Sequence, residues 1–369
     1  MTENIPNRSG DPFTTDDESQ ILNTSDRWLE KDVKDKVLAL DHADEYPTQM
    51  VEQMKSLGLF GATISQRYGG LGMPSASYAK VVTAVSEVWM SLTGIFNSHL
   101  IMAAAVERFG TEEQRQRFLP KFATGEIRGG LALTEPSCGT DLQAIRTKAH
   151  KDGDHYVING AKTWISNGIQ GDCVALLVKT DTEIQPRHKG MSLFLAEKGP
   201  GFSVGPKLEK LGYKGIDSAE LFFDDYVIAA NNLIGGQEGH GFHHTVGGLE
   251  LGRINIAARG VGVANAALKA ATSYAQTRET MGKPIGQHQA IQTKLGDMAT
   301  RCHAARLLVQ DAAQAYDRGE RCDMEAGMAK LFASEAAMEN AAECMRIHGA
   351  YGYSKESHVE RYYRDAPLM

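Results

Sequence analysis

The amino-acid sequence predicts an α+β multidomain protein: an N-terminal helical domain, a central antiparallel β domain and a C-terminal four-helix bundle. Apolar residues recur at helical spacing from about residue 25 to 122, and again from about residue 241 onward. Between these regions, short alternating segments are separated by dipeptides that favour tight turns. We therefore divide the chain into a polar leader (1–20), a helical domain (21–128), a β domain (129–240) and a helical bundle (241–369).

The leader and the first helical domain differ in polarity. The leader is acidic and polar, matches neither a signal peptide nor an Arg-rich transit peptide, and is expected to be partly disordered. In the helical domain, Pro47 suits the first turn of a helix, and Met50 and Met54 share one face of that helix. Thr111 and Gln114 have the spacing of a capping box, which predicts another helix start.

Two tight-turn dipeptides define the start of the β domain. Asp152-Gly153 and Asn159-Gly160 are each flanked by alternating apolar residues, and such dipeptides favour two-residue hairpin loops. We therefore predict two successive hairpins. The stretches CVALLVK, MSLFLAE and AELFFDDYVI are predicted to be further strands of the same sheet.

Long helical stripes dominate the last region. Ile291, Leu295, Met298 and Cys302 recur near the 3.6-residue period, and a second stripe begins at Met324. Alanine and glycine at the expected helix contacts allow close approach. This pattern is typical of a bundle of long helices.

Composition narrows the class of function. A net charge of −7 and a pI near 6.0 disfavour nucleic acid or an anionic membrane as the main partner. We found no apolar run of membrane-spanning length. The five cysteines form no CxxC pair, which favours a reducing compartment, so we expect a cytoplasmic protein.

Two motifs look like ligand sites but are better explained by packing. GVGVAN (260–265) lacks the preceding strand and the sixth-position glycine of a dinucleotide-binding motif. We predict instead a helix that packs closely through Gly260 and Gly262. Three histidines crowd GHGFHH (239–244), but no second cluster of ligands has matching spacing, so we expect no metal site.

Two stretches of the β domain carry residues suited to ligand binding. LALTEPSCGTD (131–141) combines two threonine hydroxyls, a proline-stiffened turn and Gly139, which permits close approach of a ligand to the backbone. In KTWISNG (162–168), Trp164 and Ser166 fall on one face of a strand, where an indole can stack on a planar ligand. Taken alone, the first stretch could be a plain turn and the second could hold an ordinary half-buried tryptophan.

Together with two later stretches, these motifs resemble those of the acyl-CoA dehydrogenase family of flavoproteins. TEPSCGTD resembles TEPxAGSD, WISNG resembles W-I-[ST]-N-G, RETMGKP (278–284) resembles RxxFG, and RIHGAYGY (346–353) resembles IHGGxGY. Their order and rough spacing match from about residue 20 to the last residue. The resemblance implies FAD as cofactor and α,β-dehydrogenation of an acyl-CoA thioester to the trans-2-enoyl-CoA. It also implies that the electrons pass to an electron-transferring flavoprotein.

The resemblance also implies a cofactor site between the β domain and the bundle. The residues that it assigns to FAD are Leu133, Thr134, Gly139, Thr140, Trp164, Ile165, Ser166, Arg278, Thr280, Met281, His288, Gln289, Arg346, Gly349 and Ala350. The members of this set up to Ser166 would lie around the flavin. Those from Arg278 onward would bind the FAD of a neighbouring subunit, which implies a homo-oligomer and, by the family pattern, a tetramer.

The acyl-CoA substrate has its own implied contacts. They are Thr140, Thr180, Glu250, Arg253 and Arg321. Glu250 and Arg253 are three residues apart and so lie on one helix face, where they could also form a simple surface ion pair.

Four positions depart from the family pattern. Met281 replaces the phenylalanine of RxxFG, Ala350 replaces the second glycine of IHGG, and Cys138 replaces the alanine of the TEP stretch. Arg346 replaces a glutamine and puts a positive charge beside the expected cofactor. That charge could strengthen contact with the diphosphate or disturb the neighbour's nucleotide.

The expected catalytic glutamate is missing from both positions where the family carries it. Isovaleryl and long-chain members carry it just before the arginine of LELGR, where this chain has Gly252. Short- and medium-chain members carry it shortly after RDA, and this chain ends four residues after Asp365. We therefore expect a C-terminally truncated chain of short- or medium-chain type, with its catalytic glutamate beyond Met369 and Glu250 as a fallback base.

Two alternatives stay open at this point. A flavin- or CoA-binding scaffold without turnover would also lack the glutamate. A flavin oxidase or monooxygenase would keep the fold and the cofactor but react with oxygen.

Overall fold

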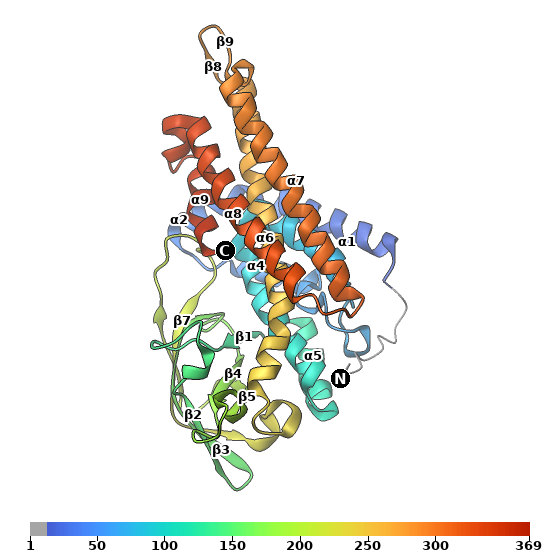
Figure 1. Cartoon of the computed structure of the whole chain (residues 1–369), viewed down its shortest axis with the longest axis vertical. Coiled ribbons are helices and arrows are strands. Elements are labelled where there is room, and N and C mark those ends of the chain that lie inside the picture. Colours follow the sequence, from blue (N-terminus) through green and yellow to red (C-terminus); the bar gives the residue numbers. More distant parts are fainter. Residues whose placement is uncertain (1–12) are drawn as a thin grey trace.

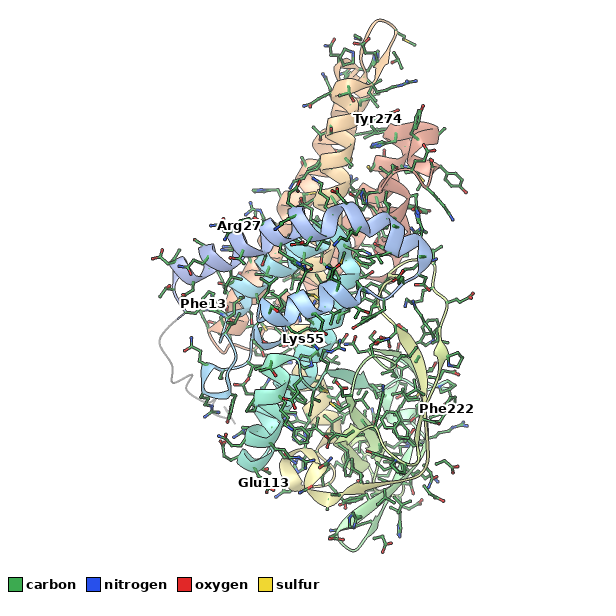
Figure 2. The ribbon with its side chains drawn as sticks, turned by 180° about the vertical axis from the view of Figure 1, so that it is seen from behind. Phe13, Arg27, Lys55, Glu113, Phe222 and Tyr274 are labelled. Carbon is green, nitrogen blue, oxygen red and sulfur yellow. The ribbon has the colours of Figure 1, made fainter. Side chains whose placement is uncertain are left out.

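A computed structural model describes residues 13–369, and it confirms the predicted order of helices, sheet and helices (Figure 1). Its N-terminal helices are α1 (Thr15–Trp28), α2 (Val37–Ala43), α3 (Thr48–Ser56), α4 (Ser75–Phe109) and α5 (Glu112–Thr124). Figure 2 shows them from behind, with Arg27, Lys55 and Glu113 marking α1, α3 and α5. The predicted capping box of Thr111 and Gln114 starts α5.

The predicted leader needs a correction. Residues 15–20 already belong to α1, because Thr14 caps that helix: its hydroxyl accepts from the backbone N–H of Asp17, whose carboxylate accepts in return from the N–H of Thr14. The rest of the leader prediction, residues 1–12, lies outside the described residues.

Helix α4 forms the centre of the molecule. It is 35 residues long and is interrupted at Trp89, whose backbone is extended. By length and composition α4 could cross a membrane, but 78% of its apolar window is buried inside the protein. That burial is what the core helix of a soluble protein shows.

The β region forms one seven-stranded sheet. Its strands are β1 (Gly129–Ala132), β2 (Lys148–Asp152), β3 (His155–Ser166), β4 (Cys173–Lys179), β5 (Met191–Glu197), β6 (Phe202–Lys207) and β7 (Ser218–Ala229). The order is β1-β4-β2-β3-β7-β6, with β5 paired to β4. The sheet is mixed rather than purely antiparallel, because β4 runs parallel to both β1 and β2.

One of the two predicted hairpins is confirmed and the other is wrong. β2 and β3 pair antiparallel around the Asp152-Gly153 turn. At Asn159-Gly160 the chain does not turn back, because β7 pairs with β3 on both sides of this point across a register shift. The extra residue of this irregularity lies on β7, where Asp224 and Asp225 face Asn159, and Asp225 has a φ of +45°. Gly160 has a φ of +148°, and a Cβ there would lie 2.5 Å from the Thr147 hydroxyl oxygen.

The C-terminal region contains α6 (Gly241–Thr277), α7 (Gln289–Asp317), α8 (Asp323–His348) and the short α9 (Val359–Asp365). A small hairpin of β8 (Glu279–Thr280) and β9 (Lys283–Pro284) lies between α6 and α7, at the end of the molecule opposite the sheet (Figure 1). The predicted four-helix bundle is corrected in its membership. Within the described residues its fourth long helix is α4, which packs against α6 and α7.

The glycines of GVGVAN pack helices together, as predicted. A Cβ on Gly260 would lie 2.6 Å from the Ala333 carbonyl oxygen of α8, and one on Gly262 would lie 2.6 Å from the Thr83 carbonyl oxygen of α4. Both contacts require glycine, so α6 is held between its neighbours at backbone distance.

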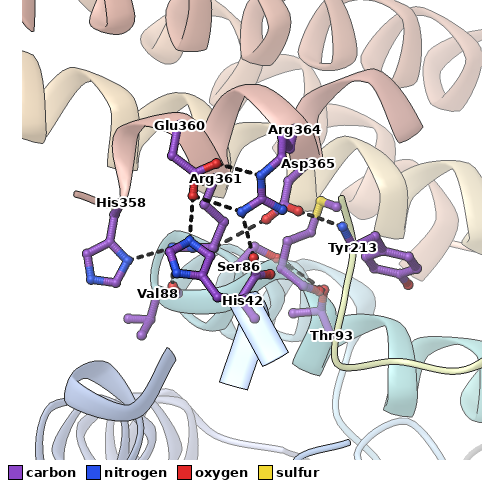
Figure 3. A network of polar contacts seen from close by, with 12 residues as sticks. His42, Ser86, Val88, Thr93, Tyr213, His358, Glu360, Arg361, Arg364 and Asp365 are labelled. Carbon is purple, nitrogen blue, oxygen red and sulfur yellow. Dashed lines mark hydrogen bonds and ion pairs between the residues drawn. The ribbon is translucent and has the colours of Figure 1, made fainter. Parts of the chain in front are cut away.

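A buried ion network joins all three regions through α9 (Figure 3). Arg364 pairs with Asp41 of α2 at 2.7 Å, and Asp365 pairs with Arg361 at 3.3 Å. Asp365 also accepts the backbone N–H of Tyr213, from the loop between β6 and β7, at 2.6 Å. These contacts hold α9 against both other regions.

Candidate functional site

Trp164 turns outward from the end of β3. The pairing of β3 with β7 shifts register between Lys162 and Ile165. Within this irregularity Trp164 has a φ of +60° and 58% of its surface exposed, whereas Ile165 is only 2% exposed and faces the core. A left-handed backbone at a bulky residue costs about 1–3 kcal/mol and is a mark of functional sites.

Leu133 and Thr134, which follow β1, lie beside Trp164. The backbone N–H of Thr163 donates to the carbonyl of Thr134 at 2.9 Å. A Cβ on Gly130 would lie 2.9 Å from the carbonyl oxygen of Ser166, so the two strands approach at a distance that glycine permits. The structure thus brings together the two stretches that the sequence singled out.

Gly139 and Thr140 lie exposed on the loop that follows Thr134. The loop is closed by two backbone hydrogen bonds between Glu135 and Cys138, at 2.9 and 3.1 Å. Cys138 is partly buried, and burial raises the pKa of its thiol. The loop therefore accommodates the side chain of Cys138, which replaces the alanine of the family pattern.

A buried ion pair beneath these segments was missed by the sequence reasoning. The Lys162 ammonium donates to Glu135 at 2.8 Å and to the Leu133 carbonyl at 3.0 Å, with no exposed surface. Burial lowers the pKa of Lys162. Burial alone would raise the pKa of Glu135, but Lys162 and hydrogen bonds from Thr147 and Arg146 outweigh it, so that pKa is lowered. In the sequence, the only indication of this pair was that Glu135 lies in the first ligand-binding motif and Lys162 in the second.

Asn167 is a second residue that the sequence reasoning missed. Its side-chain amide donates to the carbonyls of Ile95 in α4 and Gly129 in β1, both at 2.9 Å, and the residue is 1% exposed with a φ of +60°. Asparagine tolerates this left-handed backbone better than most residues. Asn167 therefore fixes the turn after Trp164 against two neighbouring elements.

The remaining predicted FAD residues lie on or beside the β8–β9 hairpin, at the end of the molecule away from the sheet (Figure 1). Arg278 follows α6, and the Thr280 hydroxyl lies 3.1 Å from a ring nitrogen of His288, next to Gln289 at the start of α7. Met281 is 94% exposed at the tip of the β8–β9 hairpin. One chain therefore does not bring these residues to Trp164.

Arg346, Gly349 and Ala350 lie at that same end. His348 of α8 stacks on Tyr274 of α6 with ring centroids 4.2 Å apart, which places the end of α8 beside the end of α6. Arg346 is exposed and pairs with Glu343, which also pairs with Lys294. The positive charge that replaces a neutral amide therefore shares the carboxylate of Glu343 with Lys294.

Three of the predicted acyl-CoA residues gather near the start of α8. The pKa of Arg321 is raised, first by its hydrogen bond and ion pair with Asp323 and also by the nearby charge of Glu250. Arg253 in turn helps to lower the pKa of Asp323. Thr180 lies apart from them, with its hydroxyl 2.7 Å from that of Ser192 on β5.

The imidazole rings of His240, His243 and His244 pack against neighbouring aromatic rings. His244 stacks on Phe109 with centroids 4.5 Å apart, and burial lowers its pKa to about 4. Within residues 13–369, no group of three or more His, Cys, Asp or Glu side chains is arranged to hold a metal ion.

Known protein families match the chain in three consecutive parts. The acyl-CoA dehydrogenase N-terminal domain matches residues 15–126, the middle domain residues 130–226 and the C-terminal domain residues 239–369. An acyl-CoA dehydrogenase of Bacillus subtilis is 41% identical over 343 residues, which is 92% of this chain and 90% of that protein.

Solved structures agree with this assignment. Butyryl-CoA dehydrogenase from Megasphaera elsdenii has a TM-score of 0.93 and 34% identity, over 97% of this chain and 94% of that chain. A chain from work on the electron transferring flavoprotein of Acidaminococcus fermentans has a TM-score of 0.93 and 36% identity, with the same coverage. This chain therefore belongs to the acyl-CoA dehydrogenase family of FAD-dependent flavoenzymes.

Proposed function

We propose that this enzyme oxidises an acyl-CoA thioester to the trans-2-enoyl-CoA and passes the electrons to an electron-transferring flavoprotein. The family supports acyl-CoA dehydrogenation, and butyryl-CoA dehydrogenase supports a saturated acyl substrate. The structural match from work on an electron transferring flavoprotein supports the acceptor. The free cysteines Cys138, Cys173, Cys302, Cys322 and Cys344 support a cytoplasmic location.

One observation carries the placement of the cofactor. Trp164 presents an exposed indole beside the half-buried Leu133 and Thr134, and a close contact between β1 and β3 holds these segments together. An exposed aromatic ring flanked by apolar and hydroxyl groups suits one face of an isoalloxazine ring. Bound there, FAD would accept the hydride from the β-carbon of the thioester.

The protein's own residues would bind and orient the substrate. Arg253 and Arg321 offer guanidinium groups that match phosphate geometry, and the charge of Glu250 acts on Arg321. We assign Glu250 to CoA contact and keep it as the fallback acceptor of the α-proton. A lost general base lowers kcat by about 10²–10⁴-fold.

We further propose a homo-oligomer, with a tetramer as the expected form. Arg278, Thr280, Met281 and Gln289 are exposed, and together with His288 and the set Arg346, Gly349 and Ala350 they lie at the end of the molecule away from the sheet. A second chain would supply them to the first chain's FAD. We expect Arg278→Ala to weaken FAD binding, with Arg318→Ala, an exposed arginine at the end of α7, as the matched control.

Absorbance spectra of the purified protein test the reaction. We expect a yellow protein whose visible flavin absorbance bleaches when butyryl- or octanoyl-CoA is added without oxygen. Glu250→Gln should keep the colour; if the wild type bleaches and this variant does not, even when it is saturated with the acyl-CoA, Glu250 is the base. A yellow wild type that never bleaches would favour a scaffold, and rapid return of colour in air would favour an oxidase or monooxygenase.

A further inference from the structure

Lys162 is the most completely buried cation near the proposed flavin site, and the reaction does not use it. Its ammonium is 0% exposed and donates to the Leu133 carbonyl at 3.0 Å and to Glu135 at 2.8 Å. Lys162 lies two residues before Trp164 and borders the register shift that turns the indole outward. Its ammonium therefore joins the strand that carries Trp164 to the segment that carries Leu133.

The hydrogen bonds of Glu135 show which part of the chain holds its carboxylate and which part contacts the Lys162 ammonium. One carboxylate oxygen of Glu135 accepts from the backbone N–H of Thr147 at 3.0 Å as well as from Lys162, and the other accepts from the N–H of Arg146 at 2.6 Å. The negative charge is thus anchored on the two residues that precede β2. The positive charge instead reaches the carbonyl of Leu133, which belongs to the segment proposed to meet the ring.

A buried ion pair is a poor device for stability alone. Taking two charges out of water costs several kcal/mol each, and replacing such pairs by packed apolar residues is often neutral or stabilising. Because the pair lies inside two predicted ligand-binding motifs, an effect on the bound ligand explains it better than stability does. In a site that excludes water, a fixed positive charge favours any state of the ligand that carries more negative charge.

We infer that Lys162 is a positioning residue that sets the spacing of the two flavin-contacting segments and raises the flavin's reduction potential. This inference rests on the proposed placement of FAD beside Leu133, Thr134 and Trp164. Its field acts through the Leu133 segment and favours the more negative, reduced cofactor. Glu135 holds the ammonium in place and opposes its field.

The midpoint potential of the bound FAD tests this role, because a merely structural lysine would not shift it in opposite directions. At a fixed potential, Lys162→Met should lower the ratio of reduced to oxidised flavin at least tenfold, equivalent to about 30 mV for two electrons. Glu135→Gln, which removes the opposing charge, should raise the ratio. Lys198→Met is the matched control: this exposed lysine donates to the Ile169 carbonyl and should leave the ratio unchanged.

A second readout separates this inference from the placement of FAD. Thr134→Val should weaken FAD affinity, measured by quenching of tryptophan fluorescence on titration of the apoprotein; an unchanged affinity means that FAD lies elsewhere. If Thr134→Val weakens binding while the Lys162 and Glu135 variants shift the potential in the same direction, or not at all, the role of Lys162 is refuted. Should Lys162→Met fail to fold, Glu135→Gln decides the question by the sign of its shift.

Discussion

Replacing Gly94 by alanine should destabilise the protein, although alanine normally strengthens a helix. Gly94 lies inside α4 against the side chain of Tyr213, from the loop between β6 and β7. A Cβ on Gly94 would lie 1.6 Å from the Tyr213 hydroxyl oxygen and 2.4 Å from the ring carbon that bears it. Ordinary contact begins near 3.4 Å, so the hydroxyl must retreat by about 1.8 Å.

The cost follows from what Tyr213 does. Its hydroxyl accepts from Arg259 of α6 at 2.9 Å, and both residues are 5% exposed. Overpacking costs about 1–3 kcal/mol, and a lost buried hydrogen bond to a charged group costs about 1.5–3 kcal/mol. We therefore expect Gly94→Ala to lower the free energy of unfolding by about 2.5–6 kcal/mol.

Urea unfolding followed by circular dichroism measures this change. The matched control is Gly296→Ala in α7, where nothing lies within 4 Å of the new Cβ and a gain of about 0.5–1 kcal/mol is expected. In a double-mutant cycle, Gly94→Ala should cost little in a Tyr213→Ala background. An equal loss in both backgrounds would show that the Tyr213 contact is not the cause.

Three further predictions concern His99, Gly160 and Asn167. Burial lowers the pKa of His99 to about 4; the unfolded chain therefore takes up a proton first, and stability should fall by up to about 3 kcal/mol as the pH drops from 6.5 to 4. His99→Phe should reduce that fall in urea titrations at pH 7 and 5, and an unchanged pH dependence would contradict it. Gly160→Ala should cost at least about 1 kcal/mol, because it strains the backbone and meets Thr147; an unchanged thermal midpoint would refute this. Asn167→Ala should cost about 1–3 kcal/mol by removing two buried hydrogen bonds, and should weaken FAD binding; unaltered urea unfolding would argue against it.

Local patterns were enough to predict most of the fold. The apolar stripes before α5 and from α6 onward are long, so their helical period predicts helices even where a single residue departs from the pattern. Asn159-Gly160 misled because turn preference is local, whereas β7 pairs with β3 on both sides of these residues and takes up the register shift there with an extra residue of its own. The membership of α4 in the bundle was equally hidden, because it depends on contacts between residues more than a hundred positions apart.

The candidate site was predicted as a set of residues but not as a geometry. The motifs contained Thr134, Trp164 and Arg278, but the structure places Arg278 beside the β8–β9 hairpin, away from the sheet that carries the other two. The left-handed backbone of Trp164 and the pairing of Lys162 with Glu135 arise from strand register. Side-chain type and spacing along the sequence do not specify register at an irregular strand, so these features required the structure.

The ion network around α9 also fixes the order in which the chain can fold. His42 pairs with Glu360 across 318 positions of sequence, and Arg364 pairs with Asp41 across 323. At about 5–20 residues per second, a ribosome releases α2 roughly 16–64 s before its partners on α9 exist. For that interval Asp41 has no guanidinium partner from α9 and stays accessible to water and chaperones. Closure of the three regions into one body is therefore a late step, because contacts of such long sequence separation form slowly.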